Sequence, residues 1–169
     1  TALILQAAYD ELIAKGYHDV SMDAIAAQVG ISKGTLYLHF ASKEAIFTAL
    51  VNEIAPFELV FGEIENIEAE TAPDYIRQIL THIMPVVIQH ADYLELIQID
   101  MREFQGTHTR ALITDRVIPR ALGIFGRIQT LPGLKVDNPL VLLRVMVSLV
   151  AGFVLTYRVN VSYLHLIPD

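Results

Sequence analysis

The stretch GISKGTLYLHFASKEAIF, from Gly30 to Phe47, decides the fold of the N-terminal part of this 169-residue chain. Apolar side chains recur at helical spacing in the residues that follow Ser32 and again in those that follow Ser42. Serine is a frequent N-cap because its hydroxyl accepts a hydrogen bond from a free N–H group of the first turn. The pattern therefore predicts two helices that begin after these serines, with Gly30 in the turn before the first of them.

Two more helices are predicted upstream of this stretch. The first runs from Thr1 to Lys15 and is ended by Gly16, and the second begins after Ser21 and ends at Gly30. Two short helices joined by a turn that contains glycine, with a third helix packed behind them, form a helix-turn-helix. The predicted inner face of the first helix consists of Leu3, Ile4, Ala7, Ala8 and Leu12.

The remainder of the chain is also predicted to be helical, because strand patterns are nearly absent. Pro56 is expected to bend or end the helix that begins after Ser42. Six glutamates between Glu53 and Glu70, with no Lys or Arg among them, indicate a solvated acidic segment. The fold class is therefore all-α, with long helices predicted over residues 74–90, 93–104, 109–131 and 139–159 and the loop LPGLKVDNP before the last one.

The composition is that of a globular protein with one large domain or two small ones, since 53% of the residues are hydrophobic. Cysteine is absent, which excludes thiol catalysis and cysteine metal sites. The first residues have no secretory signal pattern. The most membrane-like segment, VMVSLVAGFVLTY, has 13 residues, whereas a spanning helix needs about 20. A cytoplasmic location without membrane contact is expected.

The third predicted helix has an exposed surface without acidic side chains, although the chain has a formal net charge of -7. Its exposed positions offer a cation, hydroxyl groups, an aromatic ring and a histidine, and its free N–H groups favour a phosphate. A structural capping role is an equal alternative for Ser21 and Ser42, and Leu38 stays unassigned. The predicted DNA-binding residues are Ser21, Ser32, Lys33, Gly34, Thr35, Tyr37, His39 and Lys43.

The run GISKGTLYLHFASKEAIF, preceded by AKGYHDVSMDAIAAQVG, resembles the N-terminal DNA-binding domain of the TetR family of bacterial transcriptional regulators. The resemblance covers about the first 50 residues. It implies a helix-turn-helix DNA-binding domain over residues 1–48 and a helical ligand-binding and dimerisation domain over residues 49–169. It also implies that Lys33, Gly34, Tyr37 and His39 occupy positions that contact bases or phosphates, and that Ser21, Thr35 and Lys43 occupy positions that grip the DNA backbone.

The charge of the N-terminal region departs from what a DNA-binding domain is expected to have. Family members often carry arginines ahead of the first helix, and this chain has none there. Residues 1–50 contain three lysines and five carboxylates, a net charge of -2. Affinity for DNA is therefore expected to depend on the local placement of a few cations, doubled in a dimer.

Two prolines indicate where a ligand pocket is expected in the second predicted domain. Pro85 and Pro119 fall inside predicted helices, and a kink at each would separate neighbouring helices enough to leave a cavity. Simple bends or helix breaks are an equal alternative, and Tyr75, Gln98 and the other polar candidates fit core or boundary positions as well. The predicted pocket residues are His82, Met84, Tyr93, Ile97, Met101, Phe104, His108, Val117 and Phe125, with no metal and no cofactor expected.

The last predicted helix, PLVLLRVMVSLVAGFVLTY, is apolar on nearly all sides. Such a helix needs cover on more than one face, and a symmetric homodimer would supply it. The predicted interface residues are Ser148, Ala151, Gly152 and Leu155.

The sequence favours a dimeric transcriptional repressor that a small, largely apolar ligand releases from a palindromic DNA operator. A helical carrier of apolar small molecules is the alternative, and it would leave the surface around Lys33 without a purpose. An enzyme is a weaker alternative, because no nucleophile, zinc or phosphate-loop motif is present. His82 and His90, eight residues apart, do not have the spacing of a known metal site.

Overall fold

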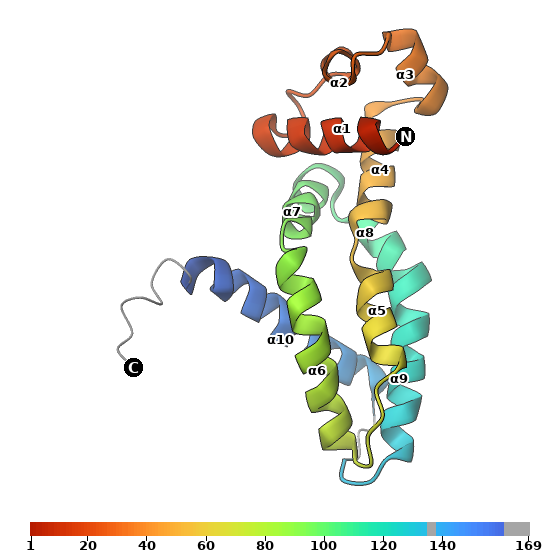
Figure 1. Ribbon diagram of the computed structural model, residues 1–169, viewed down its shortest axis with the longest axis vertical. Helices are drawn as coiled ribbons and strands as arrows, with labels where there is room; N and C mark the ends of the chain where they lie inside the picture. Colours follow the sequence, from red (N-terminus) through yellow and green to blue (C-terminus); the bar gives the residue numbers. More distant parts are fainter. Residues whose placement is uncertain (135–137, 161–169) are drawn as a thin grey trace. The chain divides into compact units, whose positions relative to one another are not determined.

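The computed structural model describes residues 1–134 and 138–160, and for Pro139, Ala151 and residues 153–160 it describes the backbone alone. Helices account for all the regular structure within these residues, which confirms the predicted all-α class (Figure 1). The elements are α1 (Ala2–Lys15), α2 (Met22–Val29), α3 (Lys33–His39), α4 (Lys43–Ile54), α5 (Phe57–Glu65), α6 (Ala72–Gln89), α7 (Tyr93–Phe104), α8 (Thr107–Leu112), the π-helical segment η1 (Ile113–Val117), α9 (Ile118–Thr130) and α10 (Pro139–Asn160).

The chain divides into two compact units, which we call the first and second units. The first unit consists of Thr1–Ala55 and Asp92–Thr114, and the second consists of Pro56–Ala91 and the residues from Asp115 onward. The units therefore do not follow the predicted limit after residue 48. The physical reason is that α4 continues to Ile54 and packs against both α7 and α8, so this later hairpin joins the N-terminal helices.

The predicted starts of the N-terminal helices are confirmed. The hydroxyls of Ser21, Ser32 and Ser42 each accept a hydrogen bond from the backbone N–H three residues later, at 3.0–3.1 Å. Gly30 ends α2 in the left-handed conformation, with φ of 77°, where a side chain would be strained. Local capping and one glycine thus set the angle at which α3 leaves α2.

The core of the first unit contains Leu12, Ile25, Leu36 and Phe47, which are all almost completely buried. One predicted core position is wrong, since Leu3 is 76% exposed. The buried residue at this end of α1 is instead Leu5, which lies three and seven residues before Ala8 and Leu12 and therefore on their face of the helix.

In the second unit, α6 packs against α5, α9 and α10 around a core that includes Tyr75, Ile79 and Ile128. α5 occupies part of the predicted acidic segment, with Phe61 and Ile64 turned into this core and all six glutamates between residues 53 and 70 exposed. The predicted helix over residues 109–131 is present as an uninterrupted helical run over residues 107–130, which consists of α8, η1 and α9. Pro119 lies within this run, two residues after the π-helical segment η1, and such segments often accommodate a local break in the α-helical hydrogen-bond pattern.

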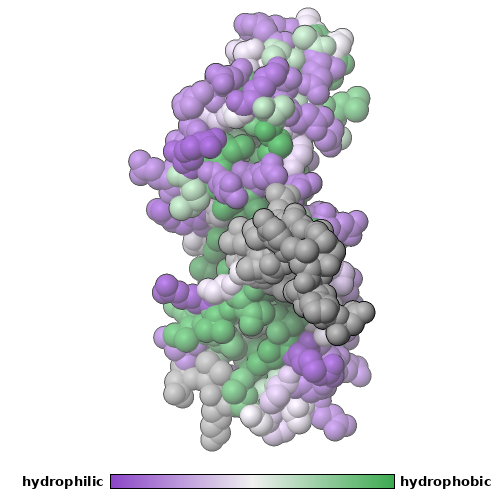
Figure 2. Space-filling view, turned by 90° about the vertical axis from the view of Figure 1, so that its left-hand side faces the viewer, coloured by the Kyte–Doolittle hydropathy of each residue, from purple (hydrophilic) through white to green (hydrophobic). Residues whose placement is uncertain are grey.

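α10 is apolar on two faces. Leu142, Met146 and Val150 pack against the core of the second unit at helical spacing. A second set of side chains remains more than half exposed, and Figure 2 shows a broad hydrophobic area on one face of this unit. The exposed set is Leu140, Val141, Val145, Val147 and Leu149.

One stretch of the described chain, Lys43–Glu65, is long and apolar enough by composition to cross a membrane. It consists of two helices divided at Pro56, and Phe47 and Leu50 are fully buried in the first unit. Apolar helices that supply side chains to a core pass the same test of composition, so the stretch is weak evidence for a membrane span.

Candidate nucleic-acid interface

Lys33, Tyr37 and His39 of α3 are exposed to solvent, as predicted. Leu38, which the sequence left unassigned, is exposed as well, and none of these side chains is acidic. Leu36 is fully buried and holds the short helix against the rest of the first unit. The side chain of Leu38 is 87% exposed, so it takes no part in the packing of this domain. A helix of a helix-turn-helix that is anchored on one side and polar and aromatic on the other can enter the major groove of DNA.

Gly34 is not required by packing within the domain. A Cβ atom added at this position would meet only the Ser32 Oγ, at 3.7 Å, which is ordinary van der Waals distance. The helical φ of Gly34 also needs no glycine, because only Gly16, Gly30, Gly106 and Gly133 have positive φ among the described glycines. A glycine at the exposed start of α3 instead leaves room for a phosphate group to come close to the backbone.

Lys33 has an acidic partner that the sequence analysis did not identify. Its Nζ atom lies 2.8 Å from Oδ2 of Asp23, an exposed residue in the first turn of α2. The hydrogen bond from Lys33 to Asp23, together with the negative charge of Asp23, raises the pKa of Lys33. The lysine is therefore held in its charged form, and its position is coupled to α2.

The hydroxyls at the start of α3 are linked to each other. Ser32 Oγ accepts a hydrogen bond from the Thr35 N–H at 3.0 Å and lies 2.8 Å from Thr35 Oγ1. A hydroxyl has one donor and two acceptor positions, so this pair retains hydrogen-bonding capacity for a phosphate oxygen. Ser21 performs the corresponding cap at the start of α2.

Lys43, which was predicted as a second phosphate contact, has a structural role in this chain. Its Nζ donates to the carbonyl oxygens of Tyr17 and Val20, at 2.5 and 2.8 Å, and lies 4.3 Å from the centroid of the Tyr17 ring. The ammonium group therefore fastens the loop between α1 and α2 to the start of α4. Of the two lysines between Gly30 and Phe47, Lys33 is therefore the one that is exposed on α3.

A buried carboxylate organises the corner between α7 and α8. Asp100 is completely buried and accepts hydrogen bonds from the backbone N–H of Thr109 at 2.8 Å and from the His108 ring nitrogen Nδ1 at 2.8 Å. Burial alone would raise the pKa of Asp100, but the hydrogen bonds from Thr109 and His108 outweigh it and lower the pKa below its usual value. The sequence carries no signal for this site, because it depends on burial.

The same corner continues into an aromatic cluster. The Phe104 ring stacks on Phe47 of α4 with centroids 5.1 Å apart, and its edge contacts with Tyr17 and His108 have centroid distances of 4.8 and 4.6 Å. Tyr93, further along α7, donates a long hydrogen bond of 3.4 Å to the carbonyl oxygen of Val51. These contacts join α7 and α8 to α4 inside the first unit.

The residues predicted to line a ligand pocket are divided between the two units. Tyr93, Ile97, Met101, Phe104 and His108 belong to the first unit. His82, Met84, Val117 and Phe125 belong to the second, in which His82 Nδ1 lies 2.8 Å from the carbonyl oxygen of Gln78. Among the predicted polar candidates, Tyr75 does line a described hollow.

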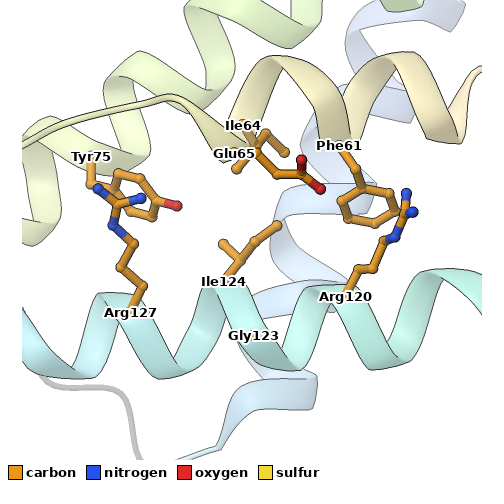
Figure 3. A pocket seen from close by; sticks show the side chains of 8 residues that line it. All are labelled: Phe61, Ile64, Glu65, Tyr75, Arg120, Gly123, Ile124 and Arg127. Atoms are coloured by element: carbon orange, nitrogen blue, oxygen red, sulfur yellow. The ribbon is translucent and has the colours of Figure 1, made fainter.

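This hollow lies in the second unit and has a volume of about 280 Å³ (Figure 3). Tyr75 comes from α6, and the aromatic and aliphatic walls come from α5 and α9. Sequence periodicity could not find this hollow, because its lining residues come from three helices, α5, α6 and α9, and periodicity does not show which helices meet. The full lining is Phe61, Ile64, Glu65, Tyr75, Arg120, Gly123, Ile124 and Arg127.

Two of the four predicted dimer residues can be placed. Ser148 and Gly152 are exposed on α10, on the same stripe as Val141 and Val145. The side chains of Ala151 and Leu155 lie outside the described part of the structure. Within the described residues no group of three or more potential metal ligands occurs.

Comparison with known proteins identifies the N-terminal domain. Residues 4–50 match the family described as "Bacterial regulatory proteins, tetR family". The HTH-type transcriptional regulator YuxN of Bacillus subtilis (strain 168) is 30% identical over 96 residues, which are 56% of this chain and 32% of that protein. The fatty acid metabolism regulator protein of the same strain is 40% identical over 50 residues, 30% of this chain and 26% of that protein. The matches thus span about a third or less of these curated relatives.

The likeness of fold extends over nearly the whole chain. The crystal structure of the transcriptional regulator FadR from Bacillus subtilis, in complex with stearoyl-CoA, resembles this chain with a TM-score of 0.75. The comparison covers 96% of this chain and 89% of that one, at 20% sequence identity. The predicted order of an N-terminal helix-turn-helix followed by a C-terminal helical domain is therefore confirmed.

Proposed function

Because residues 4–50 match the TetR family of bacterial regulatory proteins, we propose that this chain is a dimeric transcriptional repressor that a small ligand releases from a palindromic DNA operator. The single observation that carries the proposal is the exposed face of α3. In a protein with a net charge of -7, this face has no carboxylate of its own and carries a cation, an aromatic hydroxyl and a histidine.

The proposed roles of the α3 residues follow from their chemistry. Tyr37 and His39 can donate and accept hydrogen bonds at base edges, and the exposed Leu38 can contact a thymine methyl group. Lys33 contacts a phosphate or a guanine. Gly34 and the hydroxyl of Thr35 receive the DNA backbone at the start of the helix.

Dimerisation through α10 is proposed because this helix keeps exposed apolar side chains within one chain. Val141, Val145, Ser148 and Gly152 follow one another at intervals of four, three and four residues, so they form one stripe on an exposed face. Burial of apolar area contributes about 25 cal/mol per Å², and a twofold axis would bury this stripe against its own copy. Two copies of α3 related by that axis would read two half-sites of a palindrome.

The proposed effector is an apolar or amphiphilic molecule. One relative is named a fatty acid metabolism regulator, and the FadR structure contains stearoyl-CoA. The second unit of this chain has a largely apolar hollow. A ligand that binds one arrangement of the dimer more tightly than another lowers DNA affinity by that difference in affinity.

The experiment that tests the proposal is fluorescence anisotropy with a palindromic duplex from the promoter of the protein's own gene. At about 150 mM salt we expect binding at least about 10³-fold tighter than to random duplex. Tyr37→Ala is expected to weaken specific binding by 10-fold or more, whereas Gln98→Ala, an exposed neutral change on α7 of the same unit, is expected to leave it unchanged. Equal binding to both duplexes would contradict the proposal and favour a small-molecule carrier.

A further inference from the structure

The hollow of the second unit has an apolar floor. Phe61 and Ile64 of α5, Ile124 of α9 and the ring of Tyr75 surround it, and Phe61, Ile64 and Tyr75 also belong to the buried core of this unit. Figure 3 shows the side chains of Ile64 and Ile124 in the middle of the hollow, with an arginine toward each end. A ligand that enters it therefore meets hydrocarbon along its length and a guanidinium group at its end.

The volume limits the size of a ligand. At about 30 Å³ for each water-sized group, 280 Å³ holds about nine non-hydrogen atoms. This volume lies just below the range of about 300–1,000 Å³ that is typical of sites for drug-sized ligands. The hollow as it stands thus accommodates a compact molecule.

The two arginines at the ends of the hollow are not equivalent. Arg120 forms an ion pair with Glu58 at 2.8 Å, and its guanidinium carbon lies 5.2 Å from the centroid of the Phe61 ring. Its charge is already compensated by a carboxylate of the same unit. A ligand anion at this end would have to compete with that carboxylate.

Arg127, seven residues further along α9, has no carboxylate partner within the described residues. Its guanidinium carbon lies 4.8 Å from the centroid of the Tyr75 ring, which is itself almost completely buried and therefore fixed. A guanidinium group that contacts an aromatic ring through its central carbon keeps N–H groups available for a ligand. This planar fork matches the two oxygens of a carboxylate.

Glu65 also lines the hollow, and it restricts the charge of the ligand. A second negative charge on the ligand would be repelled by this carboxylate, because Arg120, the other cation in the described lining, is already paired with Glu58. A dianionic phosphate monoester is therefore disfavoured relative to a singly charged carboxylate.

Gly123 keeps the hollow open. It lies inside α9, where glycine is less favourable than alanine by about 1 kcal/mol, and a Cβ added there would meet no atom within 4 Å. Packing within the chain therefore does not require glycine at this position. Gly126, in the same helix, would also tolerate a Cβ, but it does not line the hollow.

We propose that this hollow binds a compact apolar monocarboxylate, with its hydrocarbon part against Phe61, Ile64 and Ile124 and its carboxylate on the in-plane N–H groups of Arg127. The site would take a medium-chain fatty acid or an aryl carboxylate of about ten non-hydrogen atoms. Its role as the effector site rests on the proposed regulatory function. The binding itself is independent of DNA.

Isothermal titration calorimetry with octanoate, octanol and octyl phosphate tests the site on the whole chain without DNA. We expect octanoate to bind at least 10-fold more tightly than the other two. Arg127→Gln is expected to weaken octanoate 10-fold or more and to leave octanol unchanged, whereas Arg120→Gln changes octanoate binding less. Equal affinities of octanoate and octanol, or an equal loss of both in Arg127→Gln, would overturn the assignment of the carboxylate to Arg127.

A pair of glycine variants tests the position of the ligand. Gly123→Leu fills the hollow and is expected to abolish octanoate binding, while Gly126→Leu makes the same change in helix propensity outside the hollow and is expected to retain it. Circular dichroism melting verifies that both variants fold. Retained binding in folded Gly123→Leu, or equal loss in both variants, would place the ligand elsewhere and overturn the proposal.

Anisotropy with the operator duplex, with and without octanoate, separates this inference from the proposed function. Specific DNA binding in a protein that fails to bind octanoate would leave the regulatory function standing and reject the ligand site. Octanoate binding with the expected variant pattern in a protein that does not distinguish operator from random duplex would support the site and reject the regulatory function.

Discussion

The two compact units place their charged side chains in opposite ways. In the first unit, Lys43 and Asp100 turn inward and are satisfied by backbone groups and by His108. In the second unit, the described core consists of apolar residues and Tyr75, and the arginines remain at the edge of a hollow. Directional polar contacts specify one geometry, whereas apolar contacts tolerate rearrangement. The first unit thus holds α3 in a defined position, and the second unit is expected to tolerate more rearrangement.

The largest expected effect contrasts an aromatic residue in each unit. Phe47→Ala removes a fully buried ring that contacts Tyr17, Phe104 and His108, and should lower the free energy of unfolding by about 3–5 kcal/mol. Phe61→Ala removes a ring beside an existing hollow and should cost less, near the lower limit of that range. Urea denaturation followed by circular dichroism measures both. A larger loss in Phe61→Ala would reverse the proposed contrast in rigidity.

The next effect separates the two lysines of the helix-turn-helix. Lys43→Met keeps the hydrocarbon stem but leaves the carbonyls of Tyr17 and Val20 without their donor, so it should lower the free energy of unfolding by about 1–3 kcal/mol. Lys33→Met removes an exposed ion pair with Asp23 and should change stability by less than about 1 kcal/mol while weakening operator binding. Denaturation and anisotropy on both variants test the assignment. Equal stability losses would contradict the structural role of Lys43.

The buried carboxylate of the first unit gives a pH dependence. The native pKa of Asp100 is lowered, so the unfolded chain binds more protons at acidic pH and stability rises with pH there. The contribution is complete above the ordinary carboxyl pKa of about 3.9 and is lost as the pH falls through the lowered native value. Asp100→Asn should lower the free energy of unfolding by about 1–2 kcal/mol at pH 7 and flatten its decline between pH 5 and 3. Parallel pH profiles of the variant and the wild type would refute this role.

The smallest expected effect compares equivalent helix caps in the two units. Ser42 Oγ accepts from the Ala45 N–H at 3.0 Å, and Thr71 Oγ1 accepts from the Asp74 N–H at 3.3 Å. Replacement of either cap by alanine should cost about 1 kcal/mol. Hydrogen exchange should then show faster opening confined to the unit that carries the change. Equal acceleration in both units would mean that they unfold as one cooperative body.

Much of the first unit could be predicted from local rules. A cap or a glycine acts on neighbouring residues, so Ser21, Ser32, Ser42 and Gly30 marked their helix limits directly in the sequence. The exposed face of α3 followed from the same reasoning, because an exposed helix face is visible from the spacing of buried residues such as Leu36.

The second unit and the roles of buried charges could not be predicted in this way. The hollow needs α5, α6 and α9 together, and α5 was hidden in a segment whose glutamates suggested a connector. The same limit applies to any ligand pocket, because helical spacing identifies apolar faces but not which faces meet. Arg127 became a candidate anchor only when its distance to Tyr75 was known.

The stretch from Gly30 to Phe47 contains features that the local sequence predicts and features that depend on distant segments. The sequence by itself determined that Gly30 to Phe47 forms a turn and two capped helices, since these features depend on backbone preferences and on contacts three or four residues apart. Only the tertiary structure decided that the exposed Lys33 pairs with Asp23 while Lys43 binds carbonyls 23 to 26 residues earlier in the chain. Two lysines in similar local sequence acquire different roles because the partner of a charge is chosen by the packing of distant segments.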